Sequence, residues 1–482
     1  MRGQRPEPLD DGSIARLCQD VRNSGAGAII RGTFFSTSRQ TGQGSLISTP
    51  TIIPRADHSI SRAEISENAL KVLYRLNKAG FEAYLVGGGV RDLLLGLHPK
   101  DFDVATNASP EQVREQFRNC RLIGRRFRLA HVFFGREIIE VATFRAHHDQ
   151  SEAEGEGHME NGLILRDNVF GTLEDDAWRR DFRVNALYYN IADFSLVDFT
   201  GGMQDLESRE LHIIGDPETR FREDPVRMLR AIRFAAKLDF QLEPEMAAVI
   251  REQAPRMGDV PAARLFEEVL KLFMHGQALR TYELLREYHL FKYLFNEADE
   301  LLDSHGAYLD PFVRQAMINT DERIAAKKPV TPAYLFAVLL WGPVRKRVEL
   351  LQDEMSVLDA LRTAGDEVVR ELVKQVTLPK RFSLPMREIW QLQARLEMRR
   401  GKRAYRMLEN RRFRAAYDFM LLREQVGEPL SELCEWWTAF QQEDEDGQAR
   451  LVRALPGNRP PRKRRSSKKK PSMQTAEVDG NK

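Results

Sequence analysis

LVGGGVRDLLLGLHPKDFDVAT, residues 85–106, carries more structural information than any other segment of this chain. Its pattern predicts a strand over 83–86, a glycine turn at Gly87–Gly89, a helix over 90–95 and a second strand over 102–105. Further strands are predicted at 132–134, 138–144, 186–190 and 196–198, and amphipathic helical patterns continue from about 219 to 442. The chain therefore combines a small mixed-sheet head with an all-helical remainder.

Asp101 and Asp103 flank Phe102 at the start of the second predicted strand. Because side chains on a strand alternate in direction, we expect both carboxylates on one face. Magnesium prefers a few hard oxygen ligands together with phosphate oxygens, and two ions can activate an attacking hydroxyl and steady a leaving pyrophosphate. The two aspartates are therefore candidate catalytic residues and metal ligands, although two solvated acids at a strand end would give the same pattern.

The glycine turn favours phosphate binding. Gly87 and Gly88 allow backbone N–H groups to approach phosphate oxygens, and Arg91 can supply a cation for a triphosphate. The turn is neither a Walker A loop nor a dinucleotide fingerprint, because the lysine of the first and the glycine spacing of the second are absent. A flexible strand-to-helix turn is the alternative interpretation.

Two further segments supply candidate active-site residues. In REIIEVATFR, Glu140 lies between apolar neighbours and is a candidate third metal ligand, or a partner of Arg145. In WRRDFRVNALYYN, Asp181 is a candidate catalytic residue that orients a ribose hydroxyl or supports the metal acids. The nucleotide-binding residues expected in the same segment are Arg179, Arg180 and Asn185.

RFREDPVRMLRAIRF places five charged residues at helical spacing, and we expect them on one side of a helix: Glu223, Asp224, Arg227, Arg230 and Arg233. An Asp acceptor beside an Arg donor complements the pairing edge of adenine, and equally that of cytosine. Guanine and uracil present the reverse order, so they would leave buried polar groups unpaired. These five residues are therefore candidate nucleotide-binding residues, unless Asp224 and Arg227 form an ordinary salt bridge.

Basic residues gather near the C-terminus. Residues 459–471 hold eight Lys or Arg and no acid, and residues 380–423 hold 13 against four acids. Such clusters bind nucleic acid by releasing condensed counterions, although a solubilising tail and a solvated helix face would look similar. The expected RNA-binding residues are Arg399, Arg400, Lys402, Arg403, Arg462, Lys463, Arg464, Arg465, Lys468, Lys469 and Lys470.

Taken together, GGGVRD with DFD, then RRDF, then EDPVRMLRAIRF resemble the bacterial branch of the nucleotidyltransferase superfamily that contains CCA-adding enzymes and poly(A) polymerases. The resemblance covers about residues 60–440 and implies an α+β fold, with a polymerase-beta-like head before a helical neck, body and RNA-binding region. It implies that Asp101 and Asp103 bind two Mg²⁺ ions, that Asp181 belongs to the active centre, and that Glu223, Asp224 and Arg227 form a protein template for the base. Arg183 stands where the family usually has Thr.

We expect five segments along the chain: a disordered leader (1–58), a catalytic head (59–210), a helical neck with the base-recognition helix (211–275), a helical body with the RNA-binding region (276–442) and a disordered basic tail (443–482). No stretch approaches the roughly 20 apolar residues that span a bilayer. The three cysteines lie far apart and indicate neither a disulfide framework nor a cysteine zinc site. These features favour a cytoplasmic protein.

Segments 124–132, 285–295 and 413–423 are similar to the poly(A) polymerase branch in particular. The resemblance therefore implies template-independent addition of AMP from ATP to RNA 3′-hydroxyl ends. The expected partners are RNA 3′ ends, ATP and, by resemblance, RNA-decay proteins, with neither a membrane nor DNA. A CCA-adding tRNA nucleotidyltransferase and a non-catalytic RNA-binding protein are the alternatives.

Overall fold

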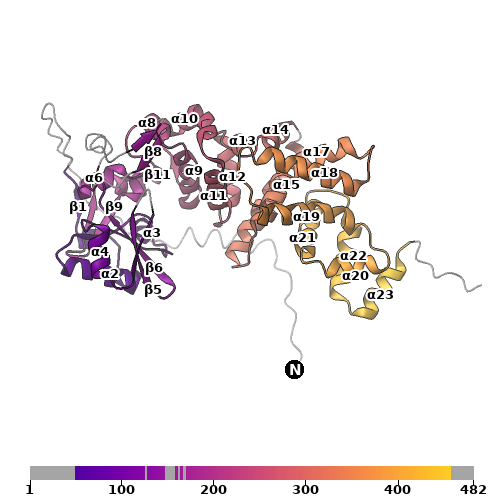
Figure 1. Cartoon of the computed structure of the whole chain (residues 1–482), viewed down its shortest axis with the longest axis horizontal. Helices are drawn as coiled ribbons and strands as arrows, with labels where there is room; N and C mark the ends of the chain where they lie inside the picture. The colour runs from indigo at the N-terminus through magenta and orange to yellow at the C-terminus, as the bar shows by residue number, and fades with distance from the viewer. Residues whose placement is uncertain are drawn as a thin grey trace, which may run out of the picture. The chain divides into compact units, whose positions relative to one another are not determined.

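The structure is a computed structural model that describes residues 49–124, 128–146, 158–160, 163–166, 170–304 and 306–456. The chain forms two compact units, Met1–Asp216 and Pro217–Lys482. The first carries the mixed sheet and the second consists almost entirely of helices (Figure 1). This arrangement confirms the predicted α+β class. The subdivision of the helical unit into neck, body and tail stays a prediction.

An eight-stranded sheet forms the centre of the head. Its strands run in the order β1 (Thr51–Ile53), β10 (Leu196–Asp198), β9 (Leu187–Asn190), β2 (Ala83–Val86), β3 (Asp103–Thr106), β6 (Glu137–Thr143), β5 (Leu129–Phe134) and β4 (Cys120–Ile123). Strands β3 and β6 pair in parallel, and the other neighbours pair antiparallel. The six predicted strands are all present, with ends that differ by at most three residues, whereas β1 and β4 were not predicted.

Helices cover the sheet, and the motifs lie on these helices or beside them at the ends of the strands. They are α2 (Glu67–Lys78), α3 (Gly88–Leu94), α4 (Pro110–Gln116), α6 (Leu173–Arg179) and α7 (Gly202–Ser208), with a 3-10 helix η3 (Arg183–Asn185). Helix α2 contacts β2, β3 and β6 because its apolar residues, Ala69, Val72, Leu73 and Leu76, recur on one side and are buried. The Ser66 hydroxyl accepts the N–H of Asn68 at 3.2 Å and so caps this helix. The short strands β7 (His158–Glu160), β8 (Leu163–Arg166) and β11 (Glu210–Leu211) complete the described head.

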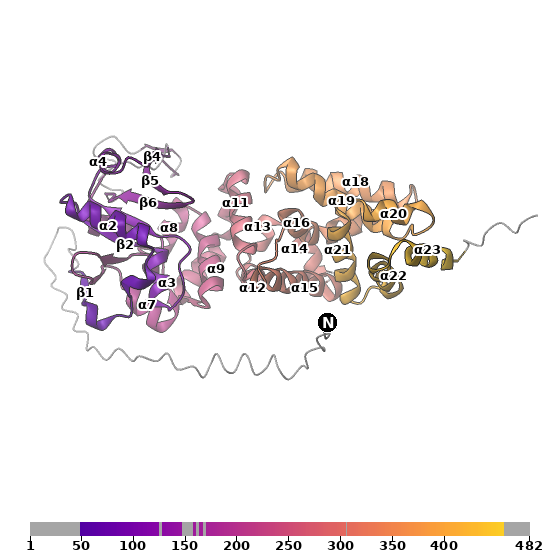
Figure 2. The same ribbon diagram turned by 90° about the horizontal axis from the view of Figure 1, so that it is seen from below.

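The second unit packs helix on helix, as Figure 2 shows for α12 with α15 and for α18 with α19. Its elements are α8 (Pro217–Glu223), α9 (Val226–Leu238), β12 (Gln241–Leu242), α10 (Pro244–Gln253), η4 (Ala254–Asp259), α11 (Ala262–Phe273), α12 (Ala278–Glu287), α13 (Phe291–Leu294), α14 (Asn296–Ser304), α15 (Gly306–Ala325), α16 (Pro332–Leu339), α17 (Trp341–Leu351), α18 (Val357–Leu372), α19 (Lys380–Leu396), α20 (Lys402–Leu408), α21 (Phe413–Gln425), α22 (Ser431–Gln442) and α23 (Glu445–Ala454). Trp390 and Trp437 are fully buried in its core. Among the described residues, no helix is long and apolar enough to cross a membrane.

Both predicted disordered ends are too long. Strand β1 lies inside the segment assigned to the leader, where it pairs with β10 and buries Ile53. Helix α23 lies inside the segment assigned to the tail, and it buries Val452. A three-residue edge strand and a helix with few large apolar residues give weak periodic patterns, so composition alone placed both boundaries wrongly. Residues 1–48 and 457–482 lie outside the described residues.

Candidate functional site

A recess of about 260 Å³ opens over the interior strands β2, β3, β6 and β5 of the head sheet. Acids and arginines line it together with apolar residues from β2, β3, β5 and β6, and the full lining is Val86, Asp103, Val104, Leu129, Glu140, Ala142, Arg145, Asp176, Arg179 and Arg180. Four of the predicted site residues, Asp103, Glu140, Arg179 and Arg180, therefore lie around one cavity. Such a mixture of carboxylates and guanidinium groups suits a metal-bound polyphosphate.

Strand register brings the acids together. Asp103 on β3 lies opposite Glu140 on β6, and Glu140 lies opposite His131 on β5. The Glu140 carboxylate is half exposed and lies 3.3 Å from His131 Nε2. Asp103 reaches solvent. Even so, desolvation by the surrounding protein, and second to it the charge of Glu140, raise the pKa of Asp103 to about 6. A carboxylate whose charge is disfavoured in this way gains stability from a bound cation.

Asp101 does not lie on the strand, because β3 begins only at Asp103. It is exposed, and its charge also contributes to the raised pKa of Asp103. Within the described ranges, no three His, Cys, Asp or Glu side chains form a cluster able to hold a metal ion. Magnesium needs only one or two carboxylates when water and substrate phosphates complete its shell, so the acids fit Mg²⁺ bound together with a nucleotide.

The glycine turn approaches this recess. Gly87 has φ 74° and ψ −138°, a conformation that L side chains rarely adopt. A Cβ placed on Gly87 would lie 3.6 Å from Arg180 Nη1 and 3.9 Å from Asp103 Oδ2. The turn thus lies against one arginine and one predicted metal ligand, and α3 begins at Gly88, two residues earlier than predicted.

Arg91 and Asn185 join the glycine motif to the RRD motif. The Arg91 side chain is buried, and its Nη1 donates to Asn185 Oδ1 at 2.6 Å while Nε and Nη2 donate to Asp92 Oδ1. Asn185 Nδ2 in turn donates to Asp181 Oδ1 at 3.2 Å. These contacts hold α3 against η3, and contact of Arg91 or Asn185 with a phosphate stays a prediction.

The predicted base-recognition helix is two helices. Pro225 provides no backbone N–H and its ring clashes with the preceding turn, so α8 ends at Glu223 and α9 begins at Val226. Asp224 lies at this break instead of on a continuous helix face. The expectation that all five charged residues share one side of a single helix is therefore wrong.

Asp224 and Arg227 do not pair with each other; each has its own partner. Arg264 of α11 holds the Asp224 carboxylate with two hydrogen bonds, Nη1 to Oδ1 at 2.9 Å and Nη2 to Oδ2 at 2.7 Å. Arg227 Nη1 donates to Glu223 Oε2 at 2.8 Å and to the Arg220 carbonyl oxygen at 2.7 Å. Arg230 and Arg233 lie over the ring of Phe234. The simple salt-bridge alternative for Asp224 and Arg227 is also wrong.

Three family models match the chain. They are the "Poly A polymerase head domain" over residues 83–212, the "Probable RNA and SrmB- binding site of polymerase A" over residues 239–302 and the "Polymerase A arginine-rich C-terminus" over residues 353–471. The Poly(A) polymerase I of Salmonella typhimurium is 52% identical over 427 residues, which cover 87% of this chain and 92% of that protein. The chain belongs to the poly(A) polymerase family.

CCA-adding enzymes are more distant relatives of this family member. The CCA-adding enzyme of Lactobacillus helveticus is 35% identical over 222 residues, which cover 46% of this chain and 53% of that protein. The structure of the Bacillus stearothermophilus CCA-adding enzyme in complex with CTP is similar with a TM-score of 0.56 and 25% identity, covering 78% of this chain and 82% of that one. The resemblance inferred from the motifs is confirmed, and its poly(A) polymerase branch is the one that extends over most of the chain.

The predicted RNA-binding residues of the chain lie in different surroundings. Arg399 is largely buried, with Nη2 3.1 Å from Glu432 Oε1 and the guanidinium 5.5 Å from the Trp436 ring centroid. Arg400, Lys402 and Arg403 are exposed. The tail residues Arg462, Lys463, Arg464, Arg465, Lys468, Lys469 and Lys470 lie outside the described residues. RNA contact by all of these residues stays a prediction.

Three residues at these sites were not predicted from the sequence: Asp176, Tyr188 and Arg264. Asp176 and Tyr188 contact Arg180, and both flank the RRD motif without belonging to it. Arg264 lies 40 residues after Asp224, on an amphipathic helix whose pattern indicates only packing. Proximity to a known motif could have suggested the first two, but no local signal identifies the third.

Proposed function

We infer that this protein adds AMP from ATP to the 3′-hydroxyl of RNA without a template and releases pyrophosphate. The similarity to a poly(A) polymerase over 87% of the chain carries this conclusion. The chain keeps every carboxylate that the motifs predict for catalysis, which argues against a non-catalytic RNA-binding protein. A CCA-adding function is disfavoured because that similarity covers only 46% of the chain.

We propose the following division of roles in the head. Asp101 and Asp103, with Glu140 beside them, would hold Mg²⁺, which would lower the charge of the triphosphate and favour ionisation of the RNA hydroxyl. The backbone of Gly87 and Gly88 and the Arg180 guanidinium would bind phosphate oxygens. Asp181 would orient the ribose. The 3′-oxygen of RNA then bonds to the α-phosphorus of ATP as the bond from that phosphorus to the pyrophosphate oxygen breaks.

In the helical unit, we propose that Asp224 and Arg227 contact the adenine edge. Arg264 fixes the Asp224 carboxylate through both oxygens. Oδ1 also accepts the Val226 N–H at 3.2 Å, so Oδ2 is the oxygen with a further lone pair that can accept the adenine amino group. Glu223 holds Arg227 with one hydrogen bond, from Nη1 to Oε2 at 2.8 Å. Polar groups held in place in this way favour one base, since they need little reorganisation when ATP binds.

Incorporation of labelled nucleotide by the full chain tests this function. The substrate is an RNA with a free 3′-hydroxyl in Mg²⁺ buffer, with ATP alone in one arm and ATP plus CTP in the other. Long ladders with ATP alone are the expected result. A stop after one to three additions would identify a CCA-adding enzyme, and the absence of product would identify an RNA-binding protein.

We further propose a cytoplasmic location and association with RNA-decay proteins. Both rest on the family resemblance. Co-purification of the tagged chain from a fractionated bacterial lysate, with and without ribonuclease, would separate direct protein contacts from contacts through RNA. Recovery of no such protein before ribonuclease treatment would argue against the association.

A further inference from the structure

Arg180 is held by a carboxylate one helical turn before it. Arg180 Nε lies 3.2 Å and Nη2 2.9 Å from Asp176 Oδ2. Asp176 itself is only 6% exposed, so its charge depends on this guanidinium for compensation. Helix α6 produces the pairing directly, because residues four apart lie on the same face of a helix.

Tyr188 of β9 closes a triangle with these two side chains. Its hydroxyl donates to Asp176 Oδ2 at 2.7 Å and accepts from Arg180 Nε at 2.9 Å. The Tyr188 ring is fully buried and lies 5.3 Å from the Arg180 guanidinium carbon. Burial raises the pKa of Tyr188 well above its usual value, so the hydroxyl keeps the proton that it donates.

The triangle sets the direction of the remaining guanidinium nitrogen. With Nε and Nη2 engaged by Asp176 and Tyr188, Nη1 donates to the Asn185 carbonyl oxygen at 3.5 Å and lies on the side of the Gly87 turn, 3.6 Å from the position of a Cβ at Gly87. Asp103 Oδ2 lies 3.9 Å from the same position. Arg180 Nη1 and the Asp103 carboxylate, a proposed metal ligand, therefore both lie beside Gly87, where the backbone carries no side chain.

We propose that Asp176 and Tyr188 are positioning residues, which hold Arg180 so that its Nη1 meets a phosphate oxygen of ATP at the Gly87 turn. This proposal rests on the proposed function, in which Arg180 binds phosphate. A long arginine side chain loses much rotamer freedom when it binds a ligand, and two fixed acceptors remove that cost in advance. In this proposal Asp176 and Tyr188 act through Arg180 and not by contact with the nucleotide.

A purely structural role for the Asp176–Arg180 ion pair predicts a different result. If Asp176 only stabilises the head, its loss and the loss of Arg180 should lower activity independently. If Asp176 acts through Arg180, its substitution should have no further effect once Arg180 is gone. A double-mutant cycle separates these cases.

The test compares Asp176→Asn, Arg180→Ala and the double variant by kcat and KM for ATP on an RNA with a free 3′-hydroxyl. Asp176→Asn alone should lower kcat/KM for ATP roughly ten- to hundredfold, with the KM for RNA unchanged. In the Arg180→Ala background the same substitution should change kcat/KM by less than about twofold. Tyr188→Phe, which keeps the buried ring, should give a smaller loss that is also absent in the Arg180→Ala background.

Asp205→Asn is the matched control. Asp205 is 1% exposed and lies 3.0 Å from His212 Nδ1 and 3.7 Å from Arg183 Nη1, so it is another buried, paired acid of the head. Asp205→Asn should change kcat/KM for ATP by the same factor in the wild type and in the Arg180→Ala background. Thermal unfolding of each variant shows which ones remain folded. If Asp176→Asn does not remain folded, Tyr188→Phe takes its place in the double-mutant cycle with Arg180→Ala.

The outcomes distinguish the two proposals. Independent, multiplicative losses in the Asp176 and Tyr188 cycles would overturn the positioning role and leave the phosphate role of Arg180 intact. Wild-type kcat/KM in Arg180→Ala would overturn that phosphate role, and the positioning role with it. A loss confined to the KM for RNA would also contradict the proposal.

Discussion

At the scale of single residues, register does more than sequence proximity to assemble the acidic site. Glu140 is distant from Asp103 in the chain, yet the parallel pairing of β3 and β6 places the two opposite each other. Adjacent strands lie about 4.8 Å apart, so these carboxylates repel each other unless a cation lies between them. The raised pKa of Asp103, about 6, reflects its partial burial first and the charge of Glu140 second.

Removing one of these carboxylates tests the metal site. Asp103→Ala or Asp101→Ala should lower nucleotide addition on the order of thousands-fold, because metal positioning and charge neutralisation supply most of the catalysis in phosphoryl transfer. RNA binding and the melting temperature should stay close to wild type. The measurement is initial-rate incorporation of AMP across a Mg²⁺ titration.

Glu115→Ala is the control, since Glu115 is an exposed acid on α4 outside the recess. It should leave the rate unchanged. Activity within tenfold of wild type in either aspartate variant would remove that residue from the metal site.

Arg264 gives a second prediction at this scale. Arg264→Ala should raise the KM for ATP and weaken discrimination between ATP and GTP, because the Asp224 carboxylate loses both fixed hydrogen bonds. A charged hydrogen bond is worth about 1.5 to 3 kcal/mol, so a loss of tenfold or more in kcat/KM for ATP is expected. Arg227→Ala should act in the same direction.

Arg256→Ala serves as the comparison, because Arg256 is a partly exposed arginine of η4 whose ion pair, with Asp259, is long at 4.0 Å. It should leave both parameters unchanged. An unaltered ATP-to-GTP preference in Arg264→Ala would show that Arg264 only stabilises the helical unit.

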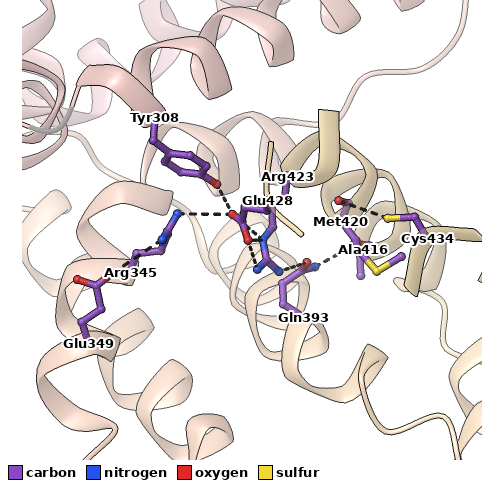
Figure 3. A network of polar contacts seen from close by, with 9 residues as sticks. All are labelled: Tyr308, Arg345, Glu349, Gln393, Ala416, Met420, Arg423, Glu428 and Cys434. Carbon is purple, nitrogen blue, oxygen red and sulfur yellow. Dashed lines mark hydrogen bonds and ion pairs between the residues drawn. The ribbon is translucent and has the colours of Figure 1, made fainter. Parts of the chain in front are cut away.

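At the scale of elements, one largely buried carboxylate joins several helices of the second unit (Figure 3). Glu428, in the loop after α21, accepts hydrogen bonds from Arg423 Nε and Nη2, from the Tyr308 hydroxyl on α15 and, at 3.5 Å, from Arg345 on α17. Arg423 Nη1 also donates to Gln393 of α19 at 3.1 Å. This network ties four helices, α15, α17, α19 and α21, to one short loop.

Glu428→Gln should therefore destabilise the helical unit by about 3 kcal/mol, because two arginines lose their buried partner. Urea unfolding of the full chain measures the loss. Glu349→Gln is a control from the same network: Glu349 is exposed and lies 3.9 Å from Arg345, so its loss should cost less than about 1 kcal/mol. Equal losses in the two variants would contradict a special role for Glu428.

The same network predicts a pH dependence. Burial disfavours the Glu428 charge, but the hydrogen bonds and charge of Arg423 outweigh it and lower the pKa of Glu428 below its ordinary value of 4.5. A lowered carboxyl pKa stabilises the folded state above pH 4.5, and this contribution is lost as the pH falls through the folded-state pKa. The stability difference between wild type and Glu428→Gln should thus be constant near neutral pH and shrink on acidification. A difference that grows in acid would refute the assignment.

At the scale of the whole molecule, the chemistry is expected in the head and the basic segments are expected to retain RNA. Truncation after Asn458 should raise the KM for RNA and shorten products, with little change in the KM for ATP, because no predicted nucleotide-binding residue lies beyond that point. Each phosphate contact removed should lower the salt slope by about 0.7 for a single strand. Processivity should fall more than the first addition, since a basic tether keeps the product near the active site.

Salt-dependent RNA binding and product-length distributions measure this effect. Replacing Lys402 and Arg403 by Gln in the full chain, where both side chains are exposed, separates the helical basic segment from the tail. Unchanged affinity, salt slope and product length after truncation would assign RNA binding to the helical unit alone.

The sequence by itself determined the local elements and the chemistry of their residues. The strand, glycine turn, helix and acids of residues 85–106 follow from side-chain periodicity and from the backbone freedom of Gly87. The family was also evident from the order of the motifs, and so was the class of reaction. Elements with weak periodicity, such as β1 and α23, escaped prediction because few of their residues are buried.

Only the tertiary structure decided which charged groups meet. Sequence spacing paired Asp224 with Arg227, whereas Pro225 breaks the helix and α11 brings Arg264 to Asp224 from 40 residues away. Likewise, packing of α6 against β9 joins Asp176 and Tyr188 to Arg180. A salt bridge depends on a few ångströms in three dimensions, and a helical or strand period carries no information about which element will pack alongside.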